Sequence, residues 1–475
     1  MFIIISIYII LLFILSFLII RHYKKYKKID VFIIFTLVYT LYYIFIPIVT
    51  NLFIHQIELE TNRVNYLYYI IHASITNKVY ALIYTVLGYV LFFIGFRLSK
   101  SRNKKSIDNH IEHIHFSHSK NRVEKVFLRF GYFMFFLGGL SFAYIIVSLG
   151  GLSRALQLAD YLRNPNVDST QYISQNVLFL KTLGGLVLGA PYAFLAAYST
   201  EKRRLTFLFF IFSMIIGILY ALFSAGKFVL LTFLGGFIVH YLIRNKRMRM
   251  LNVILFSLLC FWIIPFLDFL FSYLATDGNI EYTNEPFELS SSIIQFAFPY
   301  CNLLNVQDMN TVLGLRWGID LINWTWNVLP SIVLRIIGLS VTEDLSDRIT
   351  MYYSMFSRQT GGTPADILTL VISQFSVIGI FLMLGIGIVL RKINSVIWRL
   401  DFEKFSFLYI GILILPYSAI FNSELVNIIK YRMSNVMLLI MVVIISKLIL
   451  KDNLKKKKAL REETTQLNKE DELIG

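Results

Sequence analysis

The sequence has almost no cysteine: only Cys260 and Cys301 occur in a chain of 475 residues. Cys260 lies in an apolar stretch and Cys301 in a polar one, so we expect no bridge between them. A disulfide framework and a cysteine-based zinc site are both excluded. The alternating apolar and polar strands of a transmembrane barrel are also missing.

Motifs for nucleotide and metal chemistry are missing as well. The sequence has no GxxxxGK[ST] phosphate loop, no Asp-x-Asp pair for a metal-bound nucleotide sugar and no HExxH zinc motif. The histidines of segment 97–125 stand among Lys, Ser and Asn, which is typical of a solvated linker; they are His110, His113, His115 and His118. We therefore expect a function that needs no metal and no cofactor.

Apolar residues, in contrast, are abundant. They make up 57% of the chain, with a mean hydropathy of +0.66, whereas soluble domains have roughly 45–50%. They fall in blocks of about 17–25 residues, the length at which a helix crosses a bilayer, and lipid forces the backbone to satisfy its own hydrogen bonds. The blocks are about 2–20, 31–54, 78–96, 126–149, 177–198, 207–226, 228–243, 251–271, 366–390, 405–422 and 433–450. The sequence thus predicts an all-α, polytopic bundle of about eleven transmembrane helices.

The distribution of charge predicts the orientation of this bundle. Basic residues follow the first block instead of preceding it, which favours a retained helix with its N-terminus outside over a cleaved signal peptide. The pair 207–226 and 228–243 must cross twice, because basic clusters flank it on both sides, and its turn Ser224-Ala225-Gly226-Lys227 then lies outside. The inside segments hold most of the 45 Lys and Arg. We attribute the net charge of +16 to this asymmetry and to anionic lipid, with no role for nucleic acid.

These spans predict one transmembrane domain, 1–450, followed by a charged cytoplasmic tail, 451–475, that we expect to be disordered. The largest outside segment is 272–365, and a loop of this length often carries function. Within it, Ser291–Leu304 and Asn327–Leu339 have the pattern of short amphipathic helices that lie on the membrane surface.

Cations on the outer side need an explanation, because that side is otherwise depleted of positive charge. The expected outer cations are Lys227, Arg154, Arg163, Arg316, Arg335, Arg348, Arg358 and Arg432. Each could be an interface anchor whose long side chain reaches the headgroups. As a group they suggest an anion-binding site.

Two outer segments have special backbone chemistry. In the first, Gly361-Gly362-Thr363-Pro364-Ala365-Asp366, we expect Thr363 to cap a helix that Pro364 begins. Its free N–H groups and the two glycines would suit an anion; the alternative is a plain helix cap. In the second, Asn422-Ser423-Glu424, the carboxylate is either a general base or a solvated loop residue. Other candidate bases are Asp320, Asp344 and Asp347, whereas Asp268 is expected at the interface.

In layout and short motifs, most of the chain resembles the bacterial O-antigen polymerase family, the Wzy-type oligosaccharide repeat-unit polymerases. Ser224-Ala225-Gly226-Lys227 is similar to a turn that usually ends in Arg in that family, so a lysine here loses the bidentate fork. The other similar elements are Gly150-Gly151 with Arg154 and Arg163, Val328-Leu329-Pro330-Ser331, Gly361 to Pro364 with Ser376 to Gly379, and Glu424 to Arg432.

The resemblance implies that repeat units linked to undecaprenyl diphosphate are polymerised at the outer face of the bacterial inner membrane, by metal-independent glycosyl transfer. It implies as partners these lipid-linked oligosaccharides, the bilayer and a chain-length regulator of polysaccharide export. The product would be O-antigen or capsule. We assign catalysis to Glu424, Arg358 and Arg432, with Glu424 as the base. We assign diphosphate binding to Lys227, Arg154, Arg163, Gly361, Gly362 and Thr363.

Three alternatives remain open. A flippase for the same lipid-linked units would need paired halves and charges buried in mid-helix, and neither is visible. The O-antigen ligases resemble this layout but look to use a histidine in the large outer loop, and 272–365 contains none. A non-catalytic membrane scaffold would tolerate the loss of any outer cation.

Overall fold

The structure, a computed structural model, describes most of the chain. The described residues are 2–26, 29–52, 66–98, 120–158, 175–224, 227–244, 255, 263, 266–267, 289–329, 331–355, 363–397, 420 and 423–451. Helices are the only regular elements in these residues, and no strand occurs among them. The all-α prediction is confirmed for this part of the chain.

Eight helices are long and apolar enough to cross a membrane. They are Phe2–Tyr26, Val31–Leu52, Ile75–Leu98, Arg122–Ser148, Leu180–Thr200, Arg204–Phe223, Ile367–Ile397 and Met433–Lys451. Each coincides with a predicted block, and a shorter apolar run, Val229–Ile238, lies inside the block 228–243. The blocks 251–271 and 405–422 fall almost entirely outside the described residues. The polytopic membrane architecture is therefore confirmed, whereas the number eleven stays a prediction.

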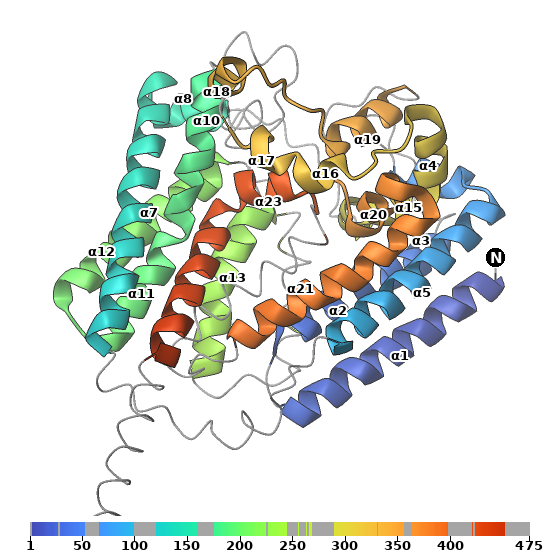
Figure 1. Cartoon of the computed structure of the whole chain (residues 1–475), viewed down its shortest axis with the longest axis horizontal. Helices are drawn as coiled ribbons and strands as arrows, with labels where there is room; N and C mark the ends of the chain where they lie inside the picture. The colour runs from blue at the N-terminus through green and yellow to red at the C-terminus, as the bar shows by residue number, and fades with distance from the viewer. Residues whose placement is uncertain are drawn as a thin grey trace, which may run out of the picture.

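Figure 1 shows the helices in two groups. One group consists of α7 (Lys120–Ser148), α8 (Leu152–Gln157), α10 (Gln175–Gly184), α11 (Ala190–Thr200), α12 (Arg204–Phe223), α13 (Lys227–Arg244) and the helix Met433–Lys451. The other consists of α1 (Phe2–Tyr26), α2 (Val31–Thr40), α3 (Ile46–Leu52), α4 (Tyr66–His72), α5 (Ile75–Leu98), α15 (Leu289–Leu313), α19 (Leu345–Ser354), α20 (Ile367–Phe375) and α21 (Leu382–Ile397). The short helices α16 (Ile319–Ile322) and α17 (Trp324–Asn327) contact α23 (Leu425–Tyr431), and α16 also contacts α20. They therefore link the groups near one end.

Short turns of other helix types interrupt several spans. The π-helical turn η1 (Leu41–Phe45) joins α2 to α3, and the 3₁₀ turn η3 (Gly185–Leu188) joins α10 to α11. The predicted continuous helix 366–390 is wrong in this respect, because Ser376 has a φ of 56° and the chain continues as the 3₁₀ turn η4 (Ser376–Phe381) before α21. Gly379 permits this break, since a Cβ there would lie 1.8 Å from the carbonyl oxygen of Val371.

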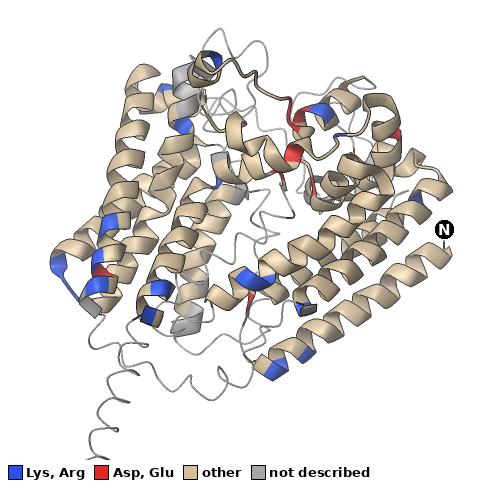
Figure 2. Cartoon of the chain, in the orientation of Figure 1, with Lys and Arg blue, Asp and Glu red and all other residues tan. Residues whose placement is uncertain are grey.

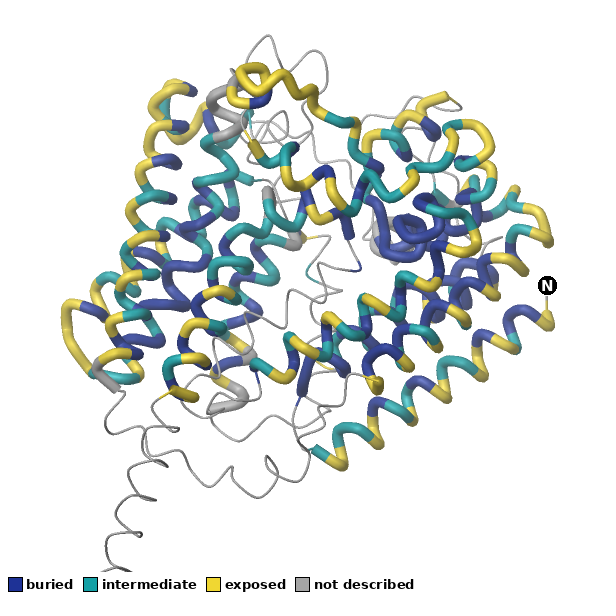
Figure 3. The backbone as a smooth tube through the Cα atoms, viewed as in Figure 1, coloured by how far each residue is buried: buried dark blue, intermediate teal, exposed yellow. Residues whose placement is uncertain are grey.

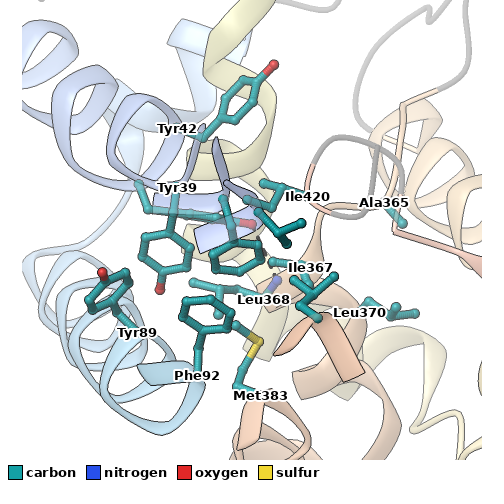
Figure 4. Close-up of a cluster of buried hydrophobic side chains, with 14 of the residues drawn as sticks. Tyr39, Tyr42, Tyr89, Phe92, Ala365, Ile367, Leu368, Leu370, Met383 and Ile420 are labelled. Carbon is teal, nitrogen blue, oxygen red and sulfur yellow. Dashed lines mark hydrogen bonds between the residues drawn. The ribbon is translucent and has the colours of Figure 1, made fainter. Parts of the chain in front are cut away.

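The first half of this broken span is deeply buried. All residues of α20 from Ile367 to Gln374 are inaccessible to solvent, and Figure 3 shows this segment as a dark core element. Its apolar side chains meet the aromatic residues of α2 and α5, including Tyr39 and Phe92 (Figure 4). This packing fixes the beginning of α20 inside the protein.

The large segment 272–365 does not form only surface helices. We expected Ser291–Leu304 to lie on the membrane surface, but it belongs to the 25-residue helix α15. This helix is buried without a break from Phe296 to Asn305 and contacts α3, α4, α5, α19 and α20. That prediction is wrong because Asn302 is buried and its amide donates to the carbonyl of Pro364 instead of to water. In contrast, α18 (Ser331–Ile336) is short, and its last residue, Ile336, is 81% exposed.

Charge divides the bundle into two ends. In Figure 2 the Lys and Arg of the described helices gather mostly at the low ends of α1, α7, α12 and α21, whereas most Asp and Glu lie near α16 and α19 at the opposite end. By the positive-inside rule, the basic end is expected to face the cytoplasm. We call the other end the outer end.

Candidate functional site: a buried polar junction

The two segments that we singled out from the sequence lie side by side at the outer end. The carbonyl oxygen of Ala365 accepts hydrogen bonds from both the backbone N–H and the hydroxyl of Ser423, each at 2.9 Å. The backbone N–H of Ala365 donates to the hydroxyl oxygen of Ser346, at 3.2 Å, in the first turn of α19. We call this meeting of α16, α17, the first turn of α19, Thr363–Asp366 and Ser423–Asn427 the polar junction.

Glu424 lies at the centre of the junction and is only 1% exposed. Its Oε1 accepts the backbone N–H groups of Leu345 and Ser346, the latter at 3.2 Å, and its Oε2 accepts the Ser346 hydroxyl and the Asn427 amide, the latter at 2.6 Å. The alternative of a solvated loop carboxylate is therefore wrong. Glu424 instead caps α19, a helix 79 residues away in sequence, because a carboxylate satisfies the free N–H groups of a first turn.

Burial raises the pKa of Glu424 from 4.5 to about 7, since an ionised carboxylate loses its hydration there. The negative charges of Asp344 and Asp320 raise it further, whereas the hydrogen bonds of Ser346 lower it. A carboxyl group with a pKa near 7 exchanges its proton at neutral pH, which a general base or acid requires. The catalytic role of Glu424 stays a prediction.

Asp344 occupies the N-cap position of α19 but does not cap it. Its Oδ1 accepts hydrogen bonds from the side-chain amides of Asn323, between α16 and α17, at 3.2 Å, and of Asn327, at the end of α17, at 2.9 Å. Asn327 also pairs with the backbone of Thr342, accepting its N–H at 3.0 Å and donating to its carbonyl at 2.7 Å. The residue placed to cap α19 is thus used to hold α17, and Glu424 takes over its role.

A strained turn places Arg316 beside the polar junction. Gly314, Trp317 and Gly318 all have positive φ, of 76°, 51° and 84°, and Trp317 is strained there because it has a side chain. The turn is held by backbone bonds to the end of α20: the N–H of Arg316 donates to Ser373 and that of Trp317 to Gln374, both at 2.9 Å.

The Arg316 guanidinium forms a two-pronged pair with Asp320, from Nε at 2.8 Å and from a terminal nitrogen at 2.5 Å, and it also donates to the carbonyl of Glu343. Gln374 donates to the same carboxylate at 2.8 Å. Asp320 is 1% exposed, and both oxygens of its carboxylate accept hydrogen bonds. Sequence reasoning ranked neither Arg316 nor Asp320, although their spacing of four residues is a usable signal.

The expected cap at Thr363 is wrong by three residues. Asp366 is the N-cap of α20, and its Oδ1 accepts the N–H of Thr369 at 3.1 Å and the hydroxyl of Tyr43 at 2.5 Å. Its Oδ2 accepts the amide of Asn302 at 3.2 Å. Because the carboxylate of Asp366 already occupies this helix N-terminus, an external anion would have to displace it. Thr363 is fully buried, and its proposed role with diphosphate stays a prediction.

The remaining predicted residues are spread along the outer end. Arg432 ends α23, eight residues after Glu424, and Lys227 is the first residue of α13. Arg154 is exposed on α8, after a turn in which Gly151 donates to Ile146 at 2.8 Å and Gly150 to Val147 at 3.1 Å, the Schellman pattern that needs glycine. Arg163, Arg358, Gly361 and Gly362 lie outside the described residues. Their assignments stay predictions.

The described residues contain no group of three or more His, Cys, Asp or Glu that could hold a metal ion. Comparisons with protein-family models, with curated proteins and with solved structures find no match for this chain.

Proposed function

We propose that this protein is an oligosaccharide repeat-unit polymerase, which joins repeat units linked to undecaprenyl diphosphate at the outer face of a bacterial inner membrane. The proposal includes an N-terminus outside and a C-terminus in the cytoplasm. The observation that carries it is the polar junction, because two motifs of the sequence, Thr363–Asp366 and Ser423–Glu424, meet there around one buried carboxyl group.

The geometry fits a glycosyl transfer without metal. The acceptor hydroxyl needs a base, and Glu424 has a pKa of about 7 at the end of the bundle away from the basic clusters. The leaving lipid diphosphate needs positive charge, and Arg432 follows the short helix α23 that Glu424 precedes. Both substrates are tethered to lipid, so a site at the outer membrane level is where they can meet.

In the structure α19 covers Glu424, because two of the four donors to its carboxylate are backbone N–H groups of that helix. We infer that the acceptor sugar reaches Glu424 only when Ser346 releases it. In this scheme the Ser346 hydroxyl, which donates to Oε2 of Glu424, holds the position that the hydroxyl of the acceptor sugar takes during the reaction.

Cells that lack the gene, complemented with single variants, test the proposal. We expect deletion to collapse the surface glycan ladder to one repeat unit. Glu424→Gln should not restore the ladder, because it removes the base and keeps the size of the side chain. Arg358→Ala together with Arg432→Ala should shorten it strongly. Arg335→Gln is the matched control, since Arg335 is an exposed outer cation on α18.

Each class of function gives a different pattern at equal protein levels. Complete loss of surface glycan on deletion indicates a flippase, and loss of glycan attachment to the lipid anchor indicates a ligase. Long chains in Glu424→Gln and in the double arginine variant remove the polymerase mechanism.

A further inference from the structure

One partly buried charge in the polar junction lacks a close partner among the described residues. Asp320, Asp366, Glu424 and Arg316 each have at least two hydrogen-bond partners. The side chain of Arg348, on α19, is 14% exposed, and its one ion pair with a described residue is a distance of 3.9 Å to Glu343. Buried guanidinium groups normally have closer acceptors than this, so Arg348 is the exception that needs an explanation.

The surroundings of Arg348 do not supply the missing acceptor. Burial lowers the pKa of its guanidinium and the positive charge of Arg316 lowers it further, whereas the negative charges of Glu343 and Asp320 offset only part of this. Glu343 is half exposed, so solvent screens its charge. The carboxylates of Asp320 and Glu424 are already taken by other donors. Among the described residues, the Arg348 guanidinium therefore keeps donors that have no close acceptor.

Arg348 lines a small pocket together with Arg316. The other polar groups in its wall are Asn310 and Ser373, and the rest of the wall consists of Met309, Leu313, Gly314, Leu345 and Ile349. No carboxylate contributes to this wall. The cavity of about 10 Å³ has room for one water molecule or one ligand oxygen, so a ligand would sit at its mouth with one oxygen inside.

We propose that Arg348 and Arg316, with Ser373 and Asn310, bind an oxyanion of the phosphate class at this pocket, a single phosphate or the diphosphate of a lipid headgroup. Arginine suits this ligand because its planar fork donates two parallel hydrogen bonds to one phosphate. The lipid source rests on the proposed polymerase function, whereas the oxyanion site itself rests on the pocket alone.

Purified full-length protein in detergent, without divalent metal, tests the site with two probes, inorganic pyrophosphate and farnesyl diphosphate. Both should raise the melting temperature of the wild type, because a ligand stabilises the state that binds it. Arg348→Gln should raise the dissociation constant about tenfold or more, and Arg348→Lys should lie between, since it keeps the charge and loses the fork. Arg335→Gln should bind like the wild type.

The two probes distinguish the sources of the oxyanion. Equal stabilisation by both indicates a site for the free diphosphate group, and a much larger effect of farnesyl diphosphate indicates a lipid headgroup. No shift of the wild type with either probe, equal binding by Arg348→Gln, or an equal shift with farnesol alone overturns the site.

The outcome is independent of the polymerase assay. Pyrophosphate binding that Arg348→Gln abolishes supports the pocket even if deletion of the gene leaves the glycan ladder intact, a result that contradicts the polymerase. Conversely, a collapsed ladder with unchanged binding by Arg348→Gln supports the polymerase and removes the pocket.

Discussion

Two buried carboxyl groups cap helices at opposite ends of this bundle, and they do so in different ways. Asp30 precedes α2 and accepts the N–H of Ile33 at 3.1 Å, three residues away. Glu424 precedes α23 but gives its carboxylate to the first turn of α19, 79 residues away. The carboxylate of Asp30 also accepts hydrogen bonds from the side chains of His22, at 2.9 Å, and Asn394, at 3.3 Å, so that α1 and α21 both contact it.

The difference teaches where function can be sought. The cap by Asp30 needs only neighbours in sequence, so it forms with its own helix and then recruits tertiary partners. The cap by Glu424 exists only when two segments distant in sequence have met, so its proton and its position depend on the tertiary contacts of the junction. A carboxyl group of the second kind can respond to a bound substrate, whereas the first kind holds a helix end.

Replacing Glu424, which caps a helix distant in sequence, should have the largest effect on stability. Glu424→Ala leaves four buried donors without their acceptor, at about 1 kcal/mol each, so we expect a loss of about 4 kcal/mol in the free energy of unfolding. Unfolding in mixed micelles measures it at pH 6. Glu424→Gln should lose less than half as much, and equal losses would contradict the capping role.

The raised pKa of Glu424 predicts a pH dependence. The native state holds the proton up to about pH 7 and the unfolded state only up to about 4.5, so this group stabilises the protein below pH 4.5 and that contribution is lost as the pH rises to 7. The stability of the wild type relative to Glu424→Gln should fall by up to about 3 kcal/mol across this window and level off above it. A relative stability that rises with pH would show the opposite shift.

Replacing Asp30, which caps the helix that follows it directly, should cost less stability. Asp30→Ala removes an N-cap and two side-chain partners, and we expect a loss of about 2 kcal/mol. Asp30→Asn is the matched control, because asparagine caps helices as well as aspartate does. The same unfolding measurement applies, and a loss larger than that of Glu424→Ala would reverse the comparison between the two ends.

Replacing Ser346, whose hydroxyl links Glu424 to Ala365, should have the smallest effect on stability. Ser346→Ala removes one donor to Glu424 and one acceptor for Ala365, and we expect a loss of about 1–2 kcal/mol. If Ser346 holds the place of the acceptor hydroxyl, this variant should keep long glycan chains in the ladder assay. Loss of all polymer at normal protein levels would show that Ser346 has a direct role.

Much of the fold follows from the sequence because lipid imposes a simple rule on it. Eight predicted spans correspond to membrane-long helices, since about 20 apolar residues can cross a bilayer only as a helix. The prediction was wrong where a contact that the apolar pattern does not encode decides the structure. The break at Ser376 depends on how closely Gly379 approaches Val371, and the burial of α15 depends on partners for Asn302.

The candidate site divides in the same way. The sequence by itself determined the apolar helices and their charge asymmetry, and it singled out Glu424 and the Thr363–Asp366 segment as candidates, because composition and local backbone chemistry depend on neighbouring residues. Only the tertiary structure decided that Glu424 is buried, that Asp366 replaces Thr363 as the cap and that Arg348 faces a pocket beside Arg316. Burial and pairing are properties of segments that meet in space, and a membrane constrains where helices cross but not which polar side chains find each other.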